Sequence, residues 1–287
     1  MYLGIDLGTS GVKATLIDAG QRVLGSETAP LTVSRPHPNW SEQDPADWIA
    51  ATEAALSALA RGQDLSGLRG IGLSGQMHGA VTLDAGGAVL RPAILWNDTR
   101  AHAEAAAMDA LPDVRRLSGN IVFPGFTAPK LVWMARHESA LFDRVACVLL
   151  PKDYLRLWLT GAHVAEMSDA AGTLWLDVAR RDWSDALLGA TGLTRAQMPA
   201  LVEGSDVDLS VIGSQKFANL DIEVIDSVHD YVTYLGKIFD FDAIRSFLQD
   251  GAFKVRFDAL HGVTGPYARA LFVERFGLDE STVQNCV

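Results

Sequence analysis

Three short stretches of the chain combine residue types that could do chemistry. The first, GIDLGTSGVK, places Asp6 at the end of an apolar run and follows it with Gly8, Thr9, Ser10 and Gly11. Because glycines permit a tight turn and a close approach, backbone N–H groups and two hydroxyls could converge there on a phosphate. Asp6 could hold Mg²⁺ through water, since Mg²⁺ keeps several waters and takes few carboxylates. A plain β-hairpin with a glycine-rich turn explains the same residues, and a P-loop does not, because no Gly-Lys-Ser/Thr triplet opens a helix.

The second stretch, GLSGQMHGAV, places Gln76, Met77 and His78 in a turn that leaves a strand. Polar side chains at the end of a rigid strand can point into a cleft. Glutamine and histidine both donate and accept hydrogen bonds, which suits sugar hydroxyls. A structural or solvated histidine is the alternative interpretation.

The third stretch, ILWNDTR, offers Trp96 as an apolar wall beside Asn97, Asp98 and Arg100. An aromatic ring next to a carboxylate and an amide is a common composition for a sugar site. Trp96 could equally belong to the core, and Asp98 could cap a helix.

The elements that must position these residues follow from hydrophobic periodicity. YLGIDLG, VKATLID and VLGSETAPL predict an antiparallel meander of three strands. A helix over 45–61 follows, with Asp44 as its N-cap and Gly62 beyond its end. LRGIGLSGQ predicts a buried strand, GAVTLDAGGAVLRPAILWND a hairpin and a further strand, and RAHAEAAAMDAL a second helix capped by Asn97 or Asp98. This mixture predicts the α/β class with a partly antiparallel sheet.

Composition excludes several classes of protein. The 287 residues are 48% hydrophobic and 21% charged, which is ordinary for a globular protein. A net charge of −11 opposes attraction to nucleic acid or to an anionic membrane, so we expect neither partner. Only Cys147 and Cys286 are present, so neither a disulfide framework nor a zinc site is expected. Without a charged leader or a run of 18 apolar residues, the chain is expected in the cytoplasm.

Composition also changes along the chain. All seven tryptophans lie within the first 183 residues, whereas eight of the eleven phenylalanines follow residue 204. We therefore predict a boundary near Gly204, between a first domain of residues 1–204 and a smaller α/β segment of residues 205–287. In the second part, DIEVID and FKVRFDAL predict strands, whereas DYVTYLGKIFDFDAIRSFLQD and GPYARALFVERFG have helical periodicity.

The first part carries an ordered set of longer motifs: MYLGIDLGTSGVKATLID, LTVSRPHPNWSEQDPADW, GLSGQMHGAV, RPAILWNDTR, PGFTAPKLVWMARHE, LLPKDYLRLWLTG and MSDAAGTLWLDVARRDWSD. This set closely resembles the N-terminal half of the bacterial xylulokinases, which are carbohydrate kinases of the FGGY family. The resemblance covers residues 1 to about 204. It implies an actin-like, ribonuclease-H-like fold, in which two such domains close on a cleft and MgATP phosphorylates the 5-hydroxyl of D-xylulose.

The same resemblance implies roles for the residues singled out above. Asp6 would act at the Mg²⁺ and phosphate site of ATP, with Gly8, Thr9, Ser10 and Lys13 nearby. Met77 and His78 would contact the sugar, and its pocket would be lined by Gln76, Trp96 and Asp98.

Two parts of the family pattern have no counterpart in the 287 residues. In the family, a second glycine-rich stretch ends in Asp-Asn, and its aspartate is the base that takes the proton from the sugar hydroxyl. A second actin-like domain holds the adenine and most of the ATP. Because a positioned base is worth about 10²- to 10⁴-fold in rate, we expect sugar binding with little or no turnover, which leaves open whether the chain acts as an enzyme.

The second part resembles a different family. VIGSQKFANLDIEVIDSVHDYVTYLGKIFDFDAIRSFLQ, FKVRFDALHGVTGPYARALFVERFG and STVQNCV resemble an internal piece of eukaryotic-type phosphoglucomutase, which implies a chimera. That family works through a phosphoserine loop and a metal-binding Asp-x-Asp-x-Asp loop, and this segment has neither. His261 and Gly262 are therefore predicted to form only a strand-to-helix turn.

Three hypotheses on function remain open. The chain could be a xylulokinase-type half that binds D-xylulose, a noncatalytic fusion scaffold, or a relative of the mutases. Surfaces that a further domain covers in the family would be apolar here, so self-association into a homo-oligomer is a further expectation.

Overall fold

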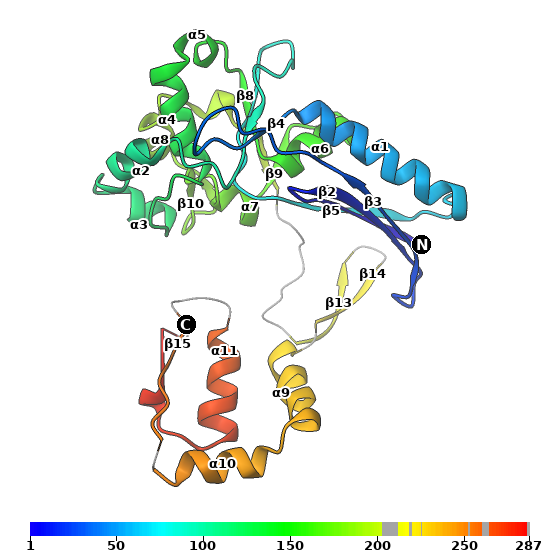
Figure 1. The fold of residues 1–287 in the computed structure, drawn as a ribbon, viewed down its shortest axis with the longest axis vertical. Coiled ribbons are helices and arrows are strands. Elements are labelled where there is room, and N and C mark those ends of the chain that lie inside the picture. Colours follow the sequence, from blue (N-terminus) through cyan, green and yellow to red (C-terminus); the bar gives the residue numbers. More distant parts are fainter. Residues whose placement is uncertain (203–211, 218–219, 225, 252, 260–263, 286–287) are drawn as a thin grey trace. The chain divides into compact units, whose positions relative to one another are not determined.

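In a computed structural model, the chain divides into two compact units, Met1–Gly204 and Ser205–Val287. The structure describes residues 1–202, 212–217, 220–224, 226–251, 253–259 and 264–285 (Figure 1). The chain around Gly204 and the predicted turn at His261 and Gly262 lie outside the described residues. Among the described residues, no helix combines the length and the hydropathy needed to span a membrane.

The first unit contains short helices and strands in alternation. Its strands are β1 (Tyr2–Leu7), β2 (Gly11–Ile17), β3 (Val23–Pro30), β4 (Glu42–Gln43), β5 (Gly70–Gly75), β6 (Val81–Leu83), β7 (Ala93–Ile94), β8 (Cys147–Leu149), β9 (Val164–Glu166), β10 (Leu176–Asp177), β11 (Asp182–Trp183) and β12 (Ala200–Val202). Its helices are α1 (Pro45–Gly62), α2 (His102–Asp109), α3 (Val114–Ser118), α4 (Thr127–His137), α5 (Ser139–Phe142), α6 (Pro151–Thr160), α7 (Met167–Ala171), α8 (Asp185–Gly189) and the 3₁₀ turn η1 (Arg195–Gln197).

The largest sheet of the first unit is mixed and has the strand order β3-β2-β1-β5. Strands β1, β2 and β3 pair in antiparallel fashion, as the predicted meander requires, and β5 runs parallel to β1. Alternation along β1 buries Leu3, Ile5 and Leu7 and leaves Gly4 and Asp6 exposed. The α/β class with a partly antiparallel sheet is confirmed.

Helix α1 covers the buried face of this sheet, where it packs on β2 and β3 (Figure 1). Asp44 is the N-cap, as predicted, and its carboxylate accepts a hydrogen bond from the Ala46 N–H at 2.9 Å. The prediction that Gly62 lies beyond the helix is wrong by one position. Gly62 is the last helical residue, because the extended backbone of Gln63 ends the helix.

Strand β5 differs from its prediction as a buried strand. It is the last strand in the order of the sheet, and Ile71 is 50% exposed. An apolar run alone does not reveal whether a strand lies at the centre or at the edge of a sheet. The predicted hairpin after β5 forms through single bridges, Leu83 with Val89 and Ala80 with Ile94, while β6 pairs with β8.

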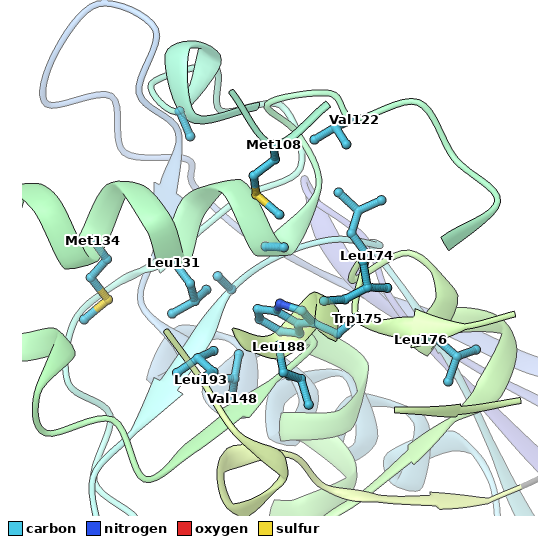
Figure 2. Close-up of a cluster of buried hydrophobic side chains, with 14 of the residues drawn as sticks. Met108, Val122, Leu131, Met134, Val148, Leu174, Trp175, Leu176, Leu188 and Leu193 are labelled. Carbon is cyan, nitrogen blue, oxygen red and sulfur yellow. The ribbon is translucent and has the colours of Figure 1, made fainter. Parts of the chain in front are cut away.

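A second core lies away from the sheet, among α2, α4, α8 and β8. Figure 2 shows Trp175 inside this cluster, whose labelled members are Met108, Val122, Leu131, Met134, Val148, Leu174, Trp175, Leu176, Leu188 and Leu193. The Trp175 indole N–H donates to the Thr191 hydroxyl at 3.1 Å, so the one polar atom of the ring is satisfied. This packing holds α4 in place, and α4 supports the candidate site.

The second unit is smaller. It consists of β13 (Gly213–Phe217), β14 (Leu220–Val224), α9 (Ser227–Ile238), α10 (Phe241–Gln249), β15 (Phe257–Asp258), α11 (Gly265–Ala268), the π-helical η2 (Arg269–Arg275), the 3₁₀ turn η3 (Glu280–Thr282) and β16 (Val283–Gln284). The helical segment predicted over 230–250 is two helices, because Phe239 is extended and Asp240 caps a new helix. The strand predicted from FKVRFDAL is only the two residues of β15.

Candidate functional site

Asp6 lies on the exposed face of β1 between two polar neighbours. The sheet register places it opposite Lys13 of β2 and opposite Ser74 of β5. The Ser74 hydroxyl donates to Asp6 Oδ1 at 2.7 Å. These side chains line an open hollow of about 330 Å³. A carboxylate, a hydroxyl and an ammonium therefore meet at one end of the sheet.

The glycine-rich turn after Asp6 is the tight connection of the β1–β2 hairpin. The Gly8 N–H donates to the Gly11 carbonyl at 3.0 Å. A Cβ on Gly11 would lie 2.8 Å from the Ala29 carbonyl oxygen, so β3 approaches too closely for a side chain. The glycine-rich turn is therefore a β-hairpin turn, and the Gly8 N–H makes its hydrogen bond inside that turn. Ser10 and Lys13 are exposed.

Thr9 joins the turn to the other two predicted stretches. Its hydroxyl donates to Gln76 Oε1 at 3.2 Å and accepts from the Trp96 indole N–H at 2.9 Å. One hydroxyl thus connects residues from the hairpin turn, the β5 turn and the segment after β7. Because the Thr9 hydroxyl donates its proton to Gln76, this proton is already used in a hydrogen bond within the protein.

Gln43 lies behind Thr9 and is buried. Its side-chain amide donates to the Thr9 carbonyl at 2.8 Å, while its Oε1 accepts from Gln76 Nε2 and from the Trp48 indole N–H, both at 3.0 Å. Every polar atom of the Gln43 side chain is engaged, which fixes the amide of Gln76. Gln76 therefore supports the turn from the inside.

His78 has a left-handed backbone, with φ of 62°, which is uncommon for a residue other than glycine. Its Nδ1 lies 2.8 Å from the Gly172 carbonyl oxygen, and its ring packs on Phe126 with centroids 4.5 Å apart. Burial lowers the pKa of His78 below its usual value, although the bond to Gly172 opposes the shift. The preceding residue, Met77, is 54% exposed.

Trp96 is 45% exposed, so the alternative that it belongs to the core is wrong. Its indole N–H is held by Thr9, and a Cβ on Gly125 would lie only 2.4 Å from the Trp96 carbonyl oxygen. The ring is therefore presented at the surface on a backbone that is closely packed.

Asp98 is fully buried and its carboxylate is enclosed by donors. It accepts from the Ser41 N–H at 2.6 Å and pairs with the Arg100 guanidinium at 2.7 Å. The alternative that Asp98 or Asn97 caps the second helix is wrong, because α2 begins after Ala101 without a side-chain cap. Asp98 anchors Arg100, whose guanidinium also lies over the Trp40 ring at 3.6 Å.

Four residues near these side chains were not identified from the sequence. They are Gln43, Ser74, Phe126 and Lys130. Ser74 could have been found, because it lies two residues before Gln76 on the face that strand alternation assigns to Asp6. Lys130 had a weaker signal, a single charge among the apolar residues of TAPKLVWMA. Gln43 and Phe126 depend on contacts that are distant in the sequence.

The residues around Asp6 fit a hydrated Mg²⁺ and a phosphate. The donor set is a carboxylate and a hydroxyl, which are hard oxygen ligands. A Cβ on Gly8 would lie 4.0 Å from Asp6 Oδ2 and 3.1 Å from the Gly11 carbonyl oxygen, so glycine keeps this approach open. Asp6 and Ser74 would hold the hydrated ion, and Lys13 would face the phosphate charge.

Comparison with known proteins places this geometry in a family. Residues 1–233 match the FGGY family of carbohydrate kinases, N-terminal domain. This chain belongs to the FGGY family of carbohydrate kinases. It is 59% identical over 208 residues to the xylulose kinase of Klebsiella pneumoniae, an alignment that covers 72% of this chain and 43% of that protein.

Solved structures of FGGY kinases have the same fold. A xylulose kinase from Brucella ovis superposes with a TM-score of 0.70 at 58% identity, covering 78% of this chain and 47% of that chain. A xylulose kinase from Rhodospirillum rubrum superposes with a TM-score of 0.67 at 32% identity, covering 70% and 42%. The actin-like fold expected from the sequence is thus confirmed. The chain spans less than half the length of these relatives.

Proposed function

We propose that residues 1–204 form the sugar-binding half of a xylulokinase-type FGGY kinase. Kinases of this type convert ATP and D-xylulose to ADP and D-xylulose 5-phosphate. The observation that carries the proposal is the Thr9 hydroxyl, which bonds both Trp96 and Gln76 and so links the turn beside Asp6 to the residues assigned to the sugar. The sequence similarity to xylulose kinases supports D-xylulose as the sugar.

His78 has a defined role in this proposal. A carbonyl oxygen can only accept, so Nδ1 must carry the proton shared with Gly172. Because burial lowers the pKa of His78, the ring is neutral at pH 7 and Nε2 is left as an acceptor for a sugar hydroxyl. Met77 and Trp96 would supply apolar surface for the carbon face of the sugar, and Gln76 and Asp98 would line the pocket from behind.

The phosphate side of the site would be formed by Asp6, Ser10 and Lys13, while Gly8 and Thr9, whose own donors bond inside the protein, would shape the turn that carries them. Bound Mg²⁺ neutralises phosphate charge and orients the transferred group. Asp6 and Ser74 would hold its water shell, because they lie opposite each other on the neighbouring strands β1 and β5. Ser10 and Lys13 are exposed donors that could reach phosphate oxygens.

We further propose that these 287 residues alone phosphorylate D-xylulose negligibly. The family's glycine-rich stretch ending in Asp-Asn does not occur in the sequence. Without that base, the rate is expected to fall by about 10²- to 10⁴-fold. ADP release that depends on D-xylulose and disappears in Asp6→Ala would contradict this part of the proposal.

The test of sugar binding is calorimetry of the purified chain at millimolar D-xylulose. We expect saturable heat for the natural sequence and none for His78→Ala. The matched control is His37→Ala, because His37 packs on Trp40 and lies outside the proposed site. Equal heats in both variants, or no heat from a cooperatively folded sample, would reject the proposal.

For residues 205–287 we propose a phosphoglucomutase-like fragment fused to the kinase-like part. The resemblance of this segment to an internal piece of that family carries the proposal. The small core of the second unit agrees with a fragment, since its buried apolar side chains among the described residues are Phe241, Ala259, Ala268 and Phe276. Cooperative unfolding of both units without any effect of sugar would favour a noncatalytic scaffold instead. Conversion of glucose 1-phosphate, abolished by His261→Ala, would favour a mutase.

A further inference from the structure

Lys130, in the first turn of α4, is 0% exposed. A lysine is rarely fully buried, because the charged ammonium loses its hydration. The contacts of the amine therefore need an explanation.

The amine bonds two backbone carbonyls that belong to different loops. Lys130 Nζ donates to the His78 carbonyl at 2.8 Å and to the Gly125 carbonyl at 2.5 Å. The His78 carbonyl also accepts from the Thr127 hydroxyl at 3.1 Å. The carbonyl group of His78 is thus held from one side by two groups of α4.

One of these loops carries His78, and the other packs against the backbone of Trp96, and both residues are assigned to the sugar. His78 has a left-handed backbone that a non-glycine residue adopts only when the surroundings hold it. Gly125 packs directly against the carbonyl of Trp96, with room for no side chain. Because Lys130 bonds both carbonyls, it ties the backbone of His78 to the loop that packs against Trp96.

The electrostatic surroundings of Lys130 agree with this arrangement. Burial lowers the pKa of the amine from 10.5 to about 7, with Asp98 opposing the shift and Arg100 adding to it. A neutral amine has two N–H bonds, and these match the two carbonyls. Lys130 also faces His78, whose pKa its charge lowers, whereas Asp169 raises the pKa of His78.

We propose that Lys130 is a positioning residue that holds His78 and Trp96 at the relative position that sugar binding requires. This inference rests on the proposed binding of D-xylulose at His78. Lys130 itself is enclosed and touches no ligand. Its effect passes through the two carbonyls.

The test compares Lys130→Met with Leu131→Ala in the full chain. Leu131 is the next residue on α4, is 1% exposed and belongs to the hydrophobic cluster, so its truncation destabilises the same helix without removing a bond to either loop. Once circular dichroism shows that both variants are folded, we expect Lys130→Met to weaken D-xylulose binding at least tenfold in calorimetry. Leu131→Ala should stay within about twofold of the natural chain.

A second readout does not depend on the sugar. The ring of His78 is followed by NMR through a pH titration, with His78→Gln used to assign its signals. His78 titrates below the pKa of about 7 of Lys130, where the amine is mostly charged, so we expect the pKa of His78 to rise in Lys130→Met and to stay unchanged in Leu131→Ala. If the natural chain binds no D-xylulose but the His78 titration shifts, the proposed function fails while the contact of Lys130 with the loop stands. Unchanged affinity in Lys130→Met, or an unchanged His78 titration, would overturn the positioning role.

Discussion

The two units of the chain differ most in how much apolar surface they bury. Among the described residues, 40 apolar side chains are buried in the first unit and four in the second. In the second unit, Tyr234, Ile238, Phe239, Phe247 and Phe253 are more than half exposed. Because stability comes chiefly from buried apolar area, the first unit can be stable by itself and the second has little to stabilise it.

This difference shows that well-capped helices with an apolar face do not by themselves produce a buried core. Helices α9 and α10 have aspartate N-caps, Asp226 and Asp240, that are as well formed as Asp44 of the first unit. Their apolar residues lie on one face, but within the second unit that face is largely exposed. Caps contribute about 1 kcal/mol each, which cannot replace a core.

The largest effect is expected from Phe276→Ala. Phe276 packs edge-on against Phe241 at 5.2 Å, and these are the two large buried side chains among the described residues of the second unit. Losing a buried phenylalanine costs about 3–5 kcal/mol, so we expect the second unit to lose its fold while the first is unaffected. Amide exchange measured by mass spectrometry would show this, with Phe247→Ala as the exposed control. Continued protection of α9 and α10 in Phe276→Ala would contradict the comparison.

A substitution of similar size in the first unit should leave that unit folded. Trp175→Ala removes a ring that is 1% exposed inside the cluster of Figure 2, and we expect the free energy of unfolding to fall by about 3–5 kcal/mol without loss of the fold. Urea unfolding measures the change. Trp158→Ala is the control, because Trp158 is 41% exposed. Equal destabilisation by the two changes would mean that the cluster is not a core.

The lowered pKa of Lys130 predicts that the free energy of unfolding of the first unit depends on pH. Folding lowers the pKa of Lys130 from 10.5 to about 7, so between these values the unfolded chain binds more protons than the folded chain. The contribution of Lys130 to the free energy of unfolding therefore rises with pH across this window, by up to about 1.4 kcal/mol per pH unit. Below pH 7 Lys130 is protonated in both the folded and the unfolded chain, so the folded chain bears the full cost of burying the charge.

This dependence is measured by urea unfolding at pH 6, 7.5 and 9. We expect the stability of the natural chain relative to Lys130→Met to increase from the lowest to the highest pH. A constant difference between the two chains would show that the folded lysine keeps its ordinary pKa.

The smallest effect is expected at the cap of α1. Asp44→Ala removes the bond to the Ala46 N–H, and we expect the first unit to lose about 1 kcal/mol. A thermal melt would show a small drop with the transition still cooperative. A change above about 3 kcal/mol would mean that Asp44 does more than cap the helix.

Local patterns in the sequence predicted the meander, the cap at Asp44 and the class of fold, because each depends on neighbours in the chain. The burial of β5 was mispredicted, since it depends on which strand lies beside it. The cap of α2 was mispredicted because Arg100 and Ser41, from different segments, bind the carboxylate of Asp98. The supporting positions of Gln43 and Lys130 were missed for the same reason. The roles assigned to the site residues remain predictions.

The most direct test of the central claim is amide exchange of the whole chain with and without D-xylulose. We predict that the sugar slows exchange in residues 76–80 and 123–130 of the first unit, where His78 and Lys130 lie, and leaves α9 and α10 of the second unit unchanged. Slower exchange only in the second unit, or no change in a sample that calorimetry shows to be folded, would contradict the claim that the first unit is a sugar-binding half by itself.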